Sequence, residues 1–310
     1  SSSGGDLVTV RDAVMTGQLD QYATEIGLWQ GIFEKYGIDL QTTEFVAGIN
    51  TIDAVVNGTA DIGMMADYAA VNRLGNTLDA TNLQIFSQIS GGQSALSGGL
   101  YVDPKYADDP KSLDGSAGFM YQEGTVTYYY ASKCIEYLGL DESKQNLINT
   151  DSSQTRLALI QKGGASAVYA NGSEAKYIEE AGWVQVATSQ KIGIQTGSYF
   201  LSTDKYISEN TDTLAKFLQA VDESTQYIND HLDESAEYLA DKLGLKAEDF
   251  KENWKNYSFE PGFSEEATTH LEDIEKWGFE HGSFPKDYNV RDFINTDVVK
   301  IAFPDNVTIE

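Results

Sequence analysis

The stretch VVNGTADIGMM, residues 55–65, decides the fold, because it leads from the end of a helix through a glycine into a strand. Just upstream, Ile49, Ile52 and Val56 lie on one helical face, and Gly58 suits the position that ends a helix. The apolar run that closes the stretch is typical of a strand. The segment therefore predicts a helix followed at once by a strand.

The same alternation extends in both directions along the chain. The hydrophobic pattern predicts strands at residues 7–10, 38–46 and 83–89, and helices at residues 20–36 and 67–75. Strands that alternate with helices at this spacing indicate βαβ units with right-handed crossovers. We therefore expect an α/β fold with a largely parallel sheet.

A glycine-rich stretch at residues 91–99 interrupts this pattern, and a second, smaller α/β run follows it. The expected strands lie at residues 100–102, 117–121, 147–150, 165–169, 184–187, 192–194 and 198–201, and the expected helices at residues 125–138 and 153–162.

After residue 201 the pattern predicts helices and no further strand. These helices cover residues 214–228, 236–243, 248–254 and 265–277. Because a block without a sheet must pack onto an existing lobe, we assign it to the first one. The predicted organisation is a flexible leader at residues 1–5, lobe 1 at residues 6–98 plus 199–310, and lobe 2 at residues 99–198.

Composition excludes several classes of function. The chain of 310 residues carries 48 acidic and 21 basic side chains, so its net charge of −27 repels nucleic acids and anionic lipids. Cys134 is the only cysteine, which rules out an intrachain disulfide, and its place in a helical pattern predicts a buried, inert thiol. The three histidines have no metal-site or triad spacing, so we expect no metal, no cofactor and no catalytic residue.

Four loops are candidates for ligand binding, because ligands of open α/β sheets bind where the carboxyl ends of strands lead into helices. Each offers unpaired backbone N–H groups at a helix start, and each lobe supplies two of the loops. A cleft between the lobes would bring them face to face. With Gly92 and Gln195 from near the two lobe crossings, the candidate ligand-binding residues are Met15, Thr16, Gly17, Gln18, Asp20, Ala66, Asp67, Tyr68, Gly92, Glu123, Gly124, Thr125, Val126, Thr127, Tyr169, Asn171 and Gln195.

These residues also have purely structural interpretations. Thr16, Thr125 and Ser173 are suited to capping helix N-termini. Asp67 and Glu123 are suited to the first turn of a helix, where acidic side chains are stabilised. The tyrosines in the loops are equally suited to core positions.

Several motifs resemble one family of substrate-binding proteins. Ala60-Asp61-Ile62-Gly63 resembles the "G-x-x-D-I-G" strand of the binding proteins for nitrate, aliphatic sulfonates, taurine and thiamine-pyrimidine precursors. Residues 23–37 resemble the first helix of that family, and residues 112–120 resemble its "S-L-x-D-L-x-G-K-x-V" segment without the lysine. Residues 165–169 resemble a further motif but lack its tryptophan and proline. The resemblance covers about residues 6 to 230.

The resemblance implies a periplasmic-binding-protein-like α/β fold with two lobes, each a mixed sheet flanked by helices, joined by two crossover segments. It also implies an extracytoplasmic solute-binding protein that does no chemistry and serves the permease and ATPase of a bacterial ABC importer. We expect a monomer. The polar leader that opens at Ser1 favours a removed signal segment and a lipid anchor, with a cloning remnant as the alternative.

The nature of the solute is inferred from charge. None of the four arginines, Arg11, Arg73, Arg156 and Arg291, falls in the candidate loops, whereas acidic side chains do. A carboxylate in a partly dry cleft needs a donor or a cation, so we favour a neutral or amine-bearing aromatic solute such as an aminopyrimidine.

Other functions remain open. An aliphatic sulfonate, taurine or nitrate could bind the same fold through backbone N–H groups. A pyrimidine-synthase-like enzyme is the alternative from another class, although it would be expected to carry a cysteine-rich motif and an essential histidine and lysine near the cleft. A sensor domain that passes ligand binding to a receptor is the third.

Overall fold

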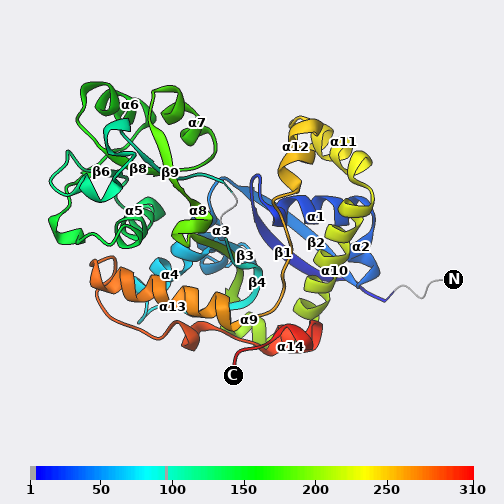
Figure 1. The fold of residues 1–310 in the computed structure, drawn as a ribbon. Helices are drawn as coiled ribbons and strands as arrows, with labels where there is room; N and C mark the ends of the chain where they lie inside the picture. The colour runs from blue at the N-terminus through cyan, green and yellow to red at the C-terminus, as the bar shows by residue number, and fades with distance from the viewer. Residues whose placement is uncertain (1–4, 95–96) are drawn as a thin grey trace. The chain divides into compact units, whose positions relative to one another are not determined.

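The computed structural model describes residues 5–94 and 97–310 and divides the chain into two compact units (Figure 1). Unit 1 comprises Ser1–Gly92 and Gly197–Glu310, and unit 2 comprises Gln93–Thr196. Of the predicted leader, all but Gly5 lies outside the described residues.

The strands of unit 1 form a mixed arrangement. The strands β1 (Val8–Met15) and β2 (Ile38–Phe45) are parallel, and a single bridge joins Asp12 of β1 to Ile62. The strand β10 (Gln195–Thr203) lies between β3 (Gly63–Ala66) and β4 (Leu83–Ser94) and runs antiparallel to β3. The expectation of a largely parallel sheet is therefore wrong, because β10 enters unit 1 from unit 2 and runs against β3. The mixed sheet that the family resemblance implies is confirmed.

Helices flank these strands. In unit 1, α10 packs on α1 and α14, α13 packs on α4, and α11 packs on α12. The helices of unit 1 are α1 (Leu19–Trp29), α2 (Ile32–Lys35), α3 (Gly48–Val56), α4 (Asp67–Gly75), α9 (Asp204–Glu209), α10 (Thr211–Asp230), α11 (Leu232–Leu243), α12 (Ala247–Trp254), α13 (Glu265–Glu280) and α14 (Asp297–Ala302), with 3₁₀ turns at η4 (Val290–Phe293) and η5 (Pro304–Asn306).

The helix predicted at residues 20–36 is two helices. The first, α1, ends at Trp29, and α2 begins at Ile32. Between them Gly31 has φ of 69°, a left-handed conformation that interrupts the helical hydrogen-bond ladder. The periodicity of the apolar residues continues across the break, which is why the pattern alone did not reveal it.

Unit 2 is built on one five-stranded sheet. The central strand β8 (Ala167–Ala170) pairs with β6 (Phe119–Tyr121) in parallel and with β5 (Gly99–Val102) in antiparallel orientation. The sheet order is β7 (Leu147–Asn149), β6, β8, β5 and β9 (Val184–Thr188). The helices are α5 (Val126–Tyr137), α6 (Ser153–Lys162), α7 (Gly172–Glu180) and α8 (Ser189–Ile192), with 3₁₀ turns at η1 (Pro104–Tyr106), η2 (Pro110–Leu113) and η3 (Glu142–Lys144).

The two faces of this sheet pack against different helices. Met120 and Val168 belong to a core cluster that includes Ile160 of α6 and Ile178 of α7. Because side chains alternate between faces along a strand, Tyr169 points the other way, and its ring lies against Tyr130 of α5. Each face is thus covered by its own helices.

The strand predicted at residues 192–194 is wrong. Residues 189–192 form the short helix α8, which Thr188 caps by accepting a hydrogen bond from the Lys191 amide. The helix ends at Gly193, whose φ is 85°. Local capping and a left-handed glycine decide this segment, and both override the apolar character of Ile192 and Ile194.

Cys134 is fully buried in α5, as predicted, and burial raises the pKa of its thiol. Within the part of the chain that the structure describes, no helix has the length and apolar character needed to cross a membrane.

Candidate ligand-binding site

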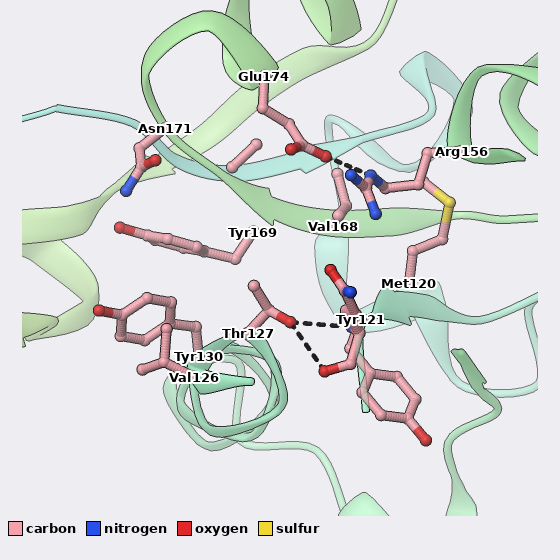
Figure 2. Close-up of a pocket in the computed structure, with 12 residues that line it drawn as sticks. Met120, Tyr121, Val126, Thr127, Tyr130, Arg156, Val168, Tyr169, Asn171 and Glu174 are labelled. Carbon is pink, nitrogen blue, oxygen red and sulfur yellow. Dashed lines mark hydrogen bonds and ion pairs between the residues drawn. The ribbon is translucent and has the colours of Figure 1, made fainter. Parts of the chain in front are cut away.

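A pocket of about 240 Å³ opens in unit 2 where β6 and β8 lead into their helices (Figure 2). The two strands are parallel neighbours, so the loops that follow them leave the sheet at the same edge. The third and fourth candidate loops both contribute to this pocket. It is lined by Met120, Tyr121, Gln122, Val126, Thr127, Tyr130, Arg156, Val168, Tyr169, Ala170, Asn171 and Glu174.

Two tyrosines form one wall of the pocket. The rings of Tyr130 and Tyr169 have centroids 4.7 Å apart and planes inclined by 52°. The Tyr169 hydroxyl is held by Ser189, with 2.9 Å between Oη and Oγ. Figure 2 shows both rings on one side of the pocket and the charged side chains on the other. The wall therefore offers a fixed aromatic surface to a ligand.

Hydrogen bonds fix the loop between β6 and α5. Thr125 caps α5 through Oγ1, which accepts from the Thr127 amide at 3.3 Å and donates to the Gln122 carbonyl at 2.8 Å. Thr127 Oγ1 accepts from the Gln122 amide at 2.8 Å. The capping interpretation of Thr125 is confirmed. Glu123 is exposed, and its amide is bonded to Asn149 Oδ1 at 2.9 Å.

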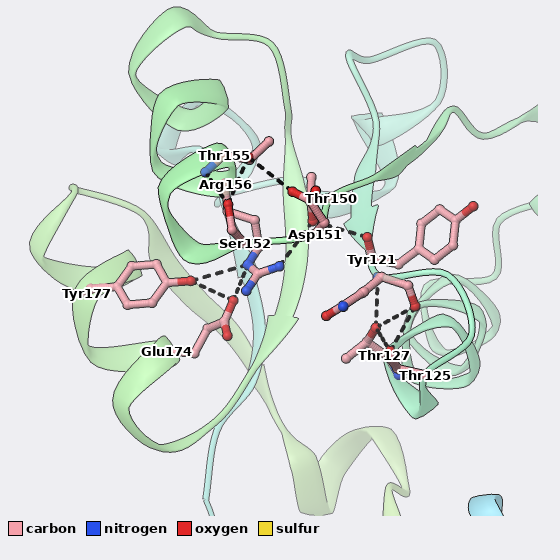
Figure 3. Close-up of polar contacts among 11 residues, drawn as sticks. Tyr121, Thr125, Thr127, Thr150, Asp151, Ser152, Thr155, Arg156, Glu174 and Tyr177 are labelled. Atoms are coloured by element: carbon pink, nitrogen blue, oxygen red, sulfur yellow. Dashed lines mark hydrogen bonds and ion pairs between the residues drawn. The ribbon is translucent and has the colours of Figure 1, made fainter.

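An ion pair occupies the opposite side of the pocket (Figure 3). Arg156 from the first turn of α6 and Glu174 from the first turn of α7 join through Nε and Oε1. Tyr177 contacts both, because its hydroxyl donates to Glu174 Oε1 at 2.6 Å and accepts from Arg156 Nε at 3.2 Å. Arg156 Nη1 donates to Thr150 Oγ1 at 3.2 Å. The Arg156 side chain is only 11% exposed.

The surroundings of Arg156 keep it charged. Burial acts to lower the pKa of its guanidinium, while the hydrogen bond to Tyr177 and the negative charge of Glu174 raise it, and the net shift is upward. None of the four arginines falls in the candidate loops, as the sequence shows. Arg156 nevertheless lines this pocket, because a side chain in the first helical turn reaches it from outside the loop.

The first candidate loop, in unit 1, has its amides engaged within the protein. The amide of Thr16 donates to the Phe45 carbonyl at 2.8 Å, that of Gly17 to Gln21 Oε1 at 2.8 Å, and that of Gln18 to the Met15 carbonyl at 3.3 Å. The expectation of unpaired amides is wrong here. Thr16 also does not cap α1, since the N-cap residue is Gln18.

Asp67, in the second loop, has an internal partner. His270 Nε2 of α13 lies 2.7 Å from Asp67 Oδ2, and the Tyr68 amide donates to Asp67 Oδ1 at 2.7 Å. Both side chains of the Asp67–His270 contact are buried. The premise that this carboxylate needs a donor from the ligand is therefore wrong. The ring of Tyr68 packs near that of Trp277, with 6.1 Å between the two ring centroids.

Two further carboxyl groups are buried in unit 1. Asp20 Oδ2 accepts from the Met15 amide at 3.1 Å, and burial raises the pKa of Asp20 to about 7. Asp12, which sequence reasoning missed, is also buried, and neither of its carboxyl oxygens is bonded to a residue that the structure describes. Burial and the nearby Asp20 raise the pKa of Asp12.

The remaining candidates occupy element ends and turns. Ala66 is the N-cap residue of α4, Gly124 lies in a left-handed turn with φ of 77°, and Gln195 begins β10. Gly92 has φ of 60°, and a Cβ there would lie 3.1 Å from Ala267 Cα. Asn171 is the N-cap residue of α7, so Ser173 is not.

Comparison with known proteins identifies the family. The family model described as "NMT1/THI5 like" matches residues 26–235, about two thirds of the chain. The chain belongs to the NMT1/THI5-like family. No curated protein matches the chain by sequence.

Solved structures share the fold of this NMT1/THI5-like chain. The periplasmic aliphatic sulphonate binding protein SsuA from Escherichia coli has a TM-score of 0.73 and 15% identity, covering 93% of this chain and 92% of that one. A putative periplasmic sulfonate-binding protein SsuA from Methylobacillus flagellatus KT has a TM-score of 0.73 and 13% identity, over 97% and 96%. The periplasmic nitrate-binding protein NrtA from Synechocystis PCC 6803 has a TM-score of 0.61 and 15% identity, over 96% and 89%. The periplasmic-binding-protein-like fold is confirmed.

The structure gathers part of the predicted site of this family member. Val126, Thr127, Tyr169 and Asn171 line the unit 2 pocket, whereas the candidates of the first two loops lie in unit 1. Ligand contacts by the latter stay a prediction. Sequence reasoning missed Tyr130, Arg156 and Glu174, although a charged residue in the first turn after a predicted strand was the available signal.

Proposed function

We propose that this protein is the extracytoplasmic solute-binding component of an ABC importer and that its solute binds in the pocket of unit 2. The observation that carries the proposal is the convergence of an aromatic wall and a polar, charged side on one pocket at the carboxyl ends of parallel strands. Membership of the NMT1/THI5-like family and a fold shared with periplasmic sulfonate- and nitrate-binding proteins support it.

The two units act in this proposal as the two lobes of a receptor. Unit 2 supplies the pocket in which the solute binds. The bound solute passes to a membrane permease that a cytoplasmic ATPase drives. In this proposal the protein is a monomer and a lipid anchors it to the membrane. Gel filtration would check the monomer, and mass measurement of the native chain would check the lipid.

The solute in this proposal is small, aromatic and neutral or amine-bearing, an aminopyrimidine for example. A flat ring suits the wall of Tyr130 and Tyr169, and an amine or amide suits Glu174, Gln122 and Asn171, which also line the pocket. The acidic group that favours such a solute is therefore Glu174, in place of Asp67 and Glu123.

A second candidate solute is an anion of the sulfonate or nitrate type. Arg156 in the pocket favours it, since a guanidinium binds oxyanions through paired hydrogen bonds. The descriptions of the structural neighbours point the same way.

We propose no catalytic step on the solute. The single cysteine, Cys134, is fully buried and its thiol pKa is raised, which disfavours thiol chemistry.

Native mass spectrometry of the purified protein tests the function. We expect a small molecule carried over at one per chain, identified after release from the protein. A thermal-shift panel of aminopyrimidines, amines, sulfonates and nitrate then ranks the classes, because a ligand at about 100 times its dissociation constant stabilises the folded state by about 2.7 kcal/mol. A protein that carries nothing and shifts with no member of the panel would contradict the proposal.

A further inference from the structure

We propose that Glu174 sets the charge preference of the unit 2 pocket by neutralising Arg156, so that the pocket accepts uncharged or amine-bearing solutes and rejects anions. The inference rests on the proposed function in that it takes this pocket to be the solute site. It identifies Glu174 as the residue that determines specificity, and it excludes the anionic class of solute.

The charge balance of the pocket is simple. Among the described residues that line it, only Arg156 and Glu174 carry a charge, one of each sign. The others are apolar, aromatic or uncharged polar side chains. Removal of one partner therefore changes the net charge of the lining from zero to a full unit.

The two partners differ in what they still offer to a solute. Arg156 is 11% exposed and already donates to Glu174, Tyr177 and Thr150. Glu174 is 33% exposed, and of its two oxygens only Oε1 is bonded to Arg156 and Tyr177. Glu174 is thus the more accessible of the two charged groups, and its other oxygen, Oε2, can accept from amines and repels oxyanions.

Tyr177 holds the pair in place. Its hydroxyl donates to Glu174 and accepts from Arg156, and it belongs to the same helix as Glu174, three residues along. The contact fixes the rotamer of Glu174 on the pocket side of α7. Figure 3 shows the three side chains meeting at one point, with Thr150 beyond the guanidinium.

The test replaces the carboxylate by an amide of the same shape, Glu174→Gln, and measures probe binding by isothermal titration calorimetry. The probes are benzenesulfonate and benzylamine, which share a ring and differ in charge. We expect Glu174→Gln to bind benzenesulfonate at least about tenfold more tightly than the wild type and benzylamine at least about tenfold more weakly.

A matched control carries the same charge change elsewhere. Arg73 and Asp53 form an ion pair in unit 1 at 2.8 Å, with Arg73 18% exposed, so Asp53→Asn also leaves one arginine unneutralised. It should leave both probe affinities within about twofold of the wild type. The double variant Arg156→Gln with Glu174→Gln should lose the gain in benzenesulfonate affinity.

Two affinity results, or an absence of all probe binding, would overturn the inference. One is a benzenesulfonate affinity of Glu174→Gln that stays within about twofold of the wild type, and the other is an equal gain in Asp53→Asn. Absence of probe binding to every variant also counts against it, since an unneutralised guanidinium in the pocket should hold the sulfonate. If Glu174→Gln fails to fold, Arg156→Gln provides the reverse test and should bind benzylamine more tightly.

The same data separate this inference from the proposed function. If Glu174→Gln gains sulfonate binding while the wild type carries no solute and shifts with no member of the thermal-shift panel, the charge assignment is supported and the transport role is contradicted. A carried-over solute with unchanged probe preference in Glu174→Gln would do the opposite.

Discussion

Individual side chains in unit 1 serve stability more than the candidate-loop reasoning assumed. Asp67 is paired with His270 across 203 residues of sequence, and Asp12 and Asp20 are buried carboxyl groups. A buried carboxylate that loses its donor pays the full desolvation penalty. The effect of substitutions at these positions should therefore appear first in the free energy of unfolding.

His270→Ala should destabilise the protein by about 1–3 kcal/mol, because it leaves the Asp67 carboxylate buried without its side-chain donor. Urea unfolding followed by tryptophan fluorescence measures this. His231→Ala is the control, because its exposed ring loses only the stacking contact with Tyr227, and it should cost no more than about 1 kcal/mol. Equal stability of the two variants would show that the Asp67–His270 contact contributes little.

The raised pKa of Asp20 should make the stability of the protein depend on pH. Its folded-state pKa of about 7 lies above the ordinary value of 3.8, so the native state binds this proton more tightly than the unfolded state. The stability contribution of the protonated group is complete below pH 3.8 and is lost as the pH rises toward 7, by up to about 1.4 kcal/mol per pH unit. Asp20→Asn removes this loss.

Urea unfolding of the wild type and Asp20→Asn at both ends of this range checks the prediction. Relative to the wild type, the variant should gain stability as the pH rises. A difference between the two proteins that is the same at both pH values would contradict the assigned burial effect.

At the scale of elements, local signals located most helices and strands of this chain. Residues 67–75 and 153–162 are helical as predicted. The first helix has an acidic residue in its first turn and ends at an asparagine, and the second has a serine N-cap and ends at a glycine. The pattern failed at Gly31 and at residues 192–194, where a left-handed glycine decides the backbone. The spacing of apolar residues does not reveal the backbone angle φ of an individual glycine.

Gly31→Ala should destabilise the protein by about 1 kcal/mol, because an L-residue in the left-handed region is strained even where space is free. Apart from its chain neighbours, no described residue has an atom within 4 Å of a Cβ built at Gly31, so the cost is conformational. Gly5→Ala also has free space but an ordinary backbone conformation, and it should change stability by a few tenths at most. A thermal melt of both variants measures the difference, and equal melting temperatures would argue against the strain.

For the chain as a whole, the large negative net charge should affect the stability of the fold. The chain has a net charge of −27, and repulsion among its negative charges lowers the stability of the folded state. Raising NaCl from about 10 mM to about 300 mM should increase the melting temperature, because the Debye length falls several-fold over that range. A calorimetric scan measures this. A melting temperature that falls with salt would mean that surface ion pairs outweigh the repulsion.

Patterns along the chain predicted the α/β class, the ends of most helices, the burial of Cys134 and the two strand-end loops that line the unit 2 pocket. These depend on hydrophobic periodicity, capping and turn residues, which act between neighbours in the chain. Three features became visible only in the folded chain: β10 runs antiparallel to β3, His270 contacts Asp67, and Glu174 forms an ion pair with Arg156. Such contacts join residues from separate helices and strands. A local sequence pattern does not specify which residues of two distant elements will lie next to each other in the folded chain.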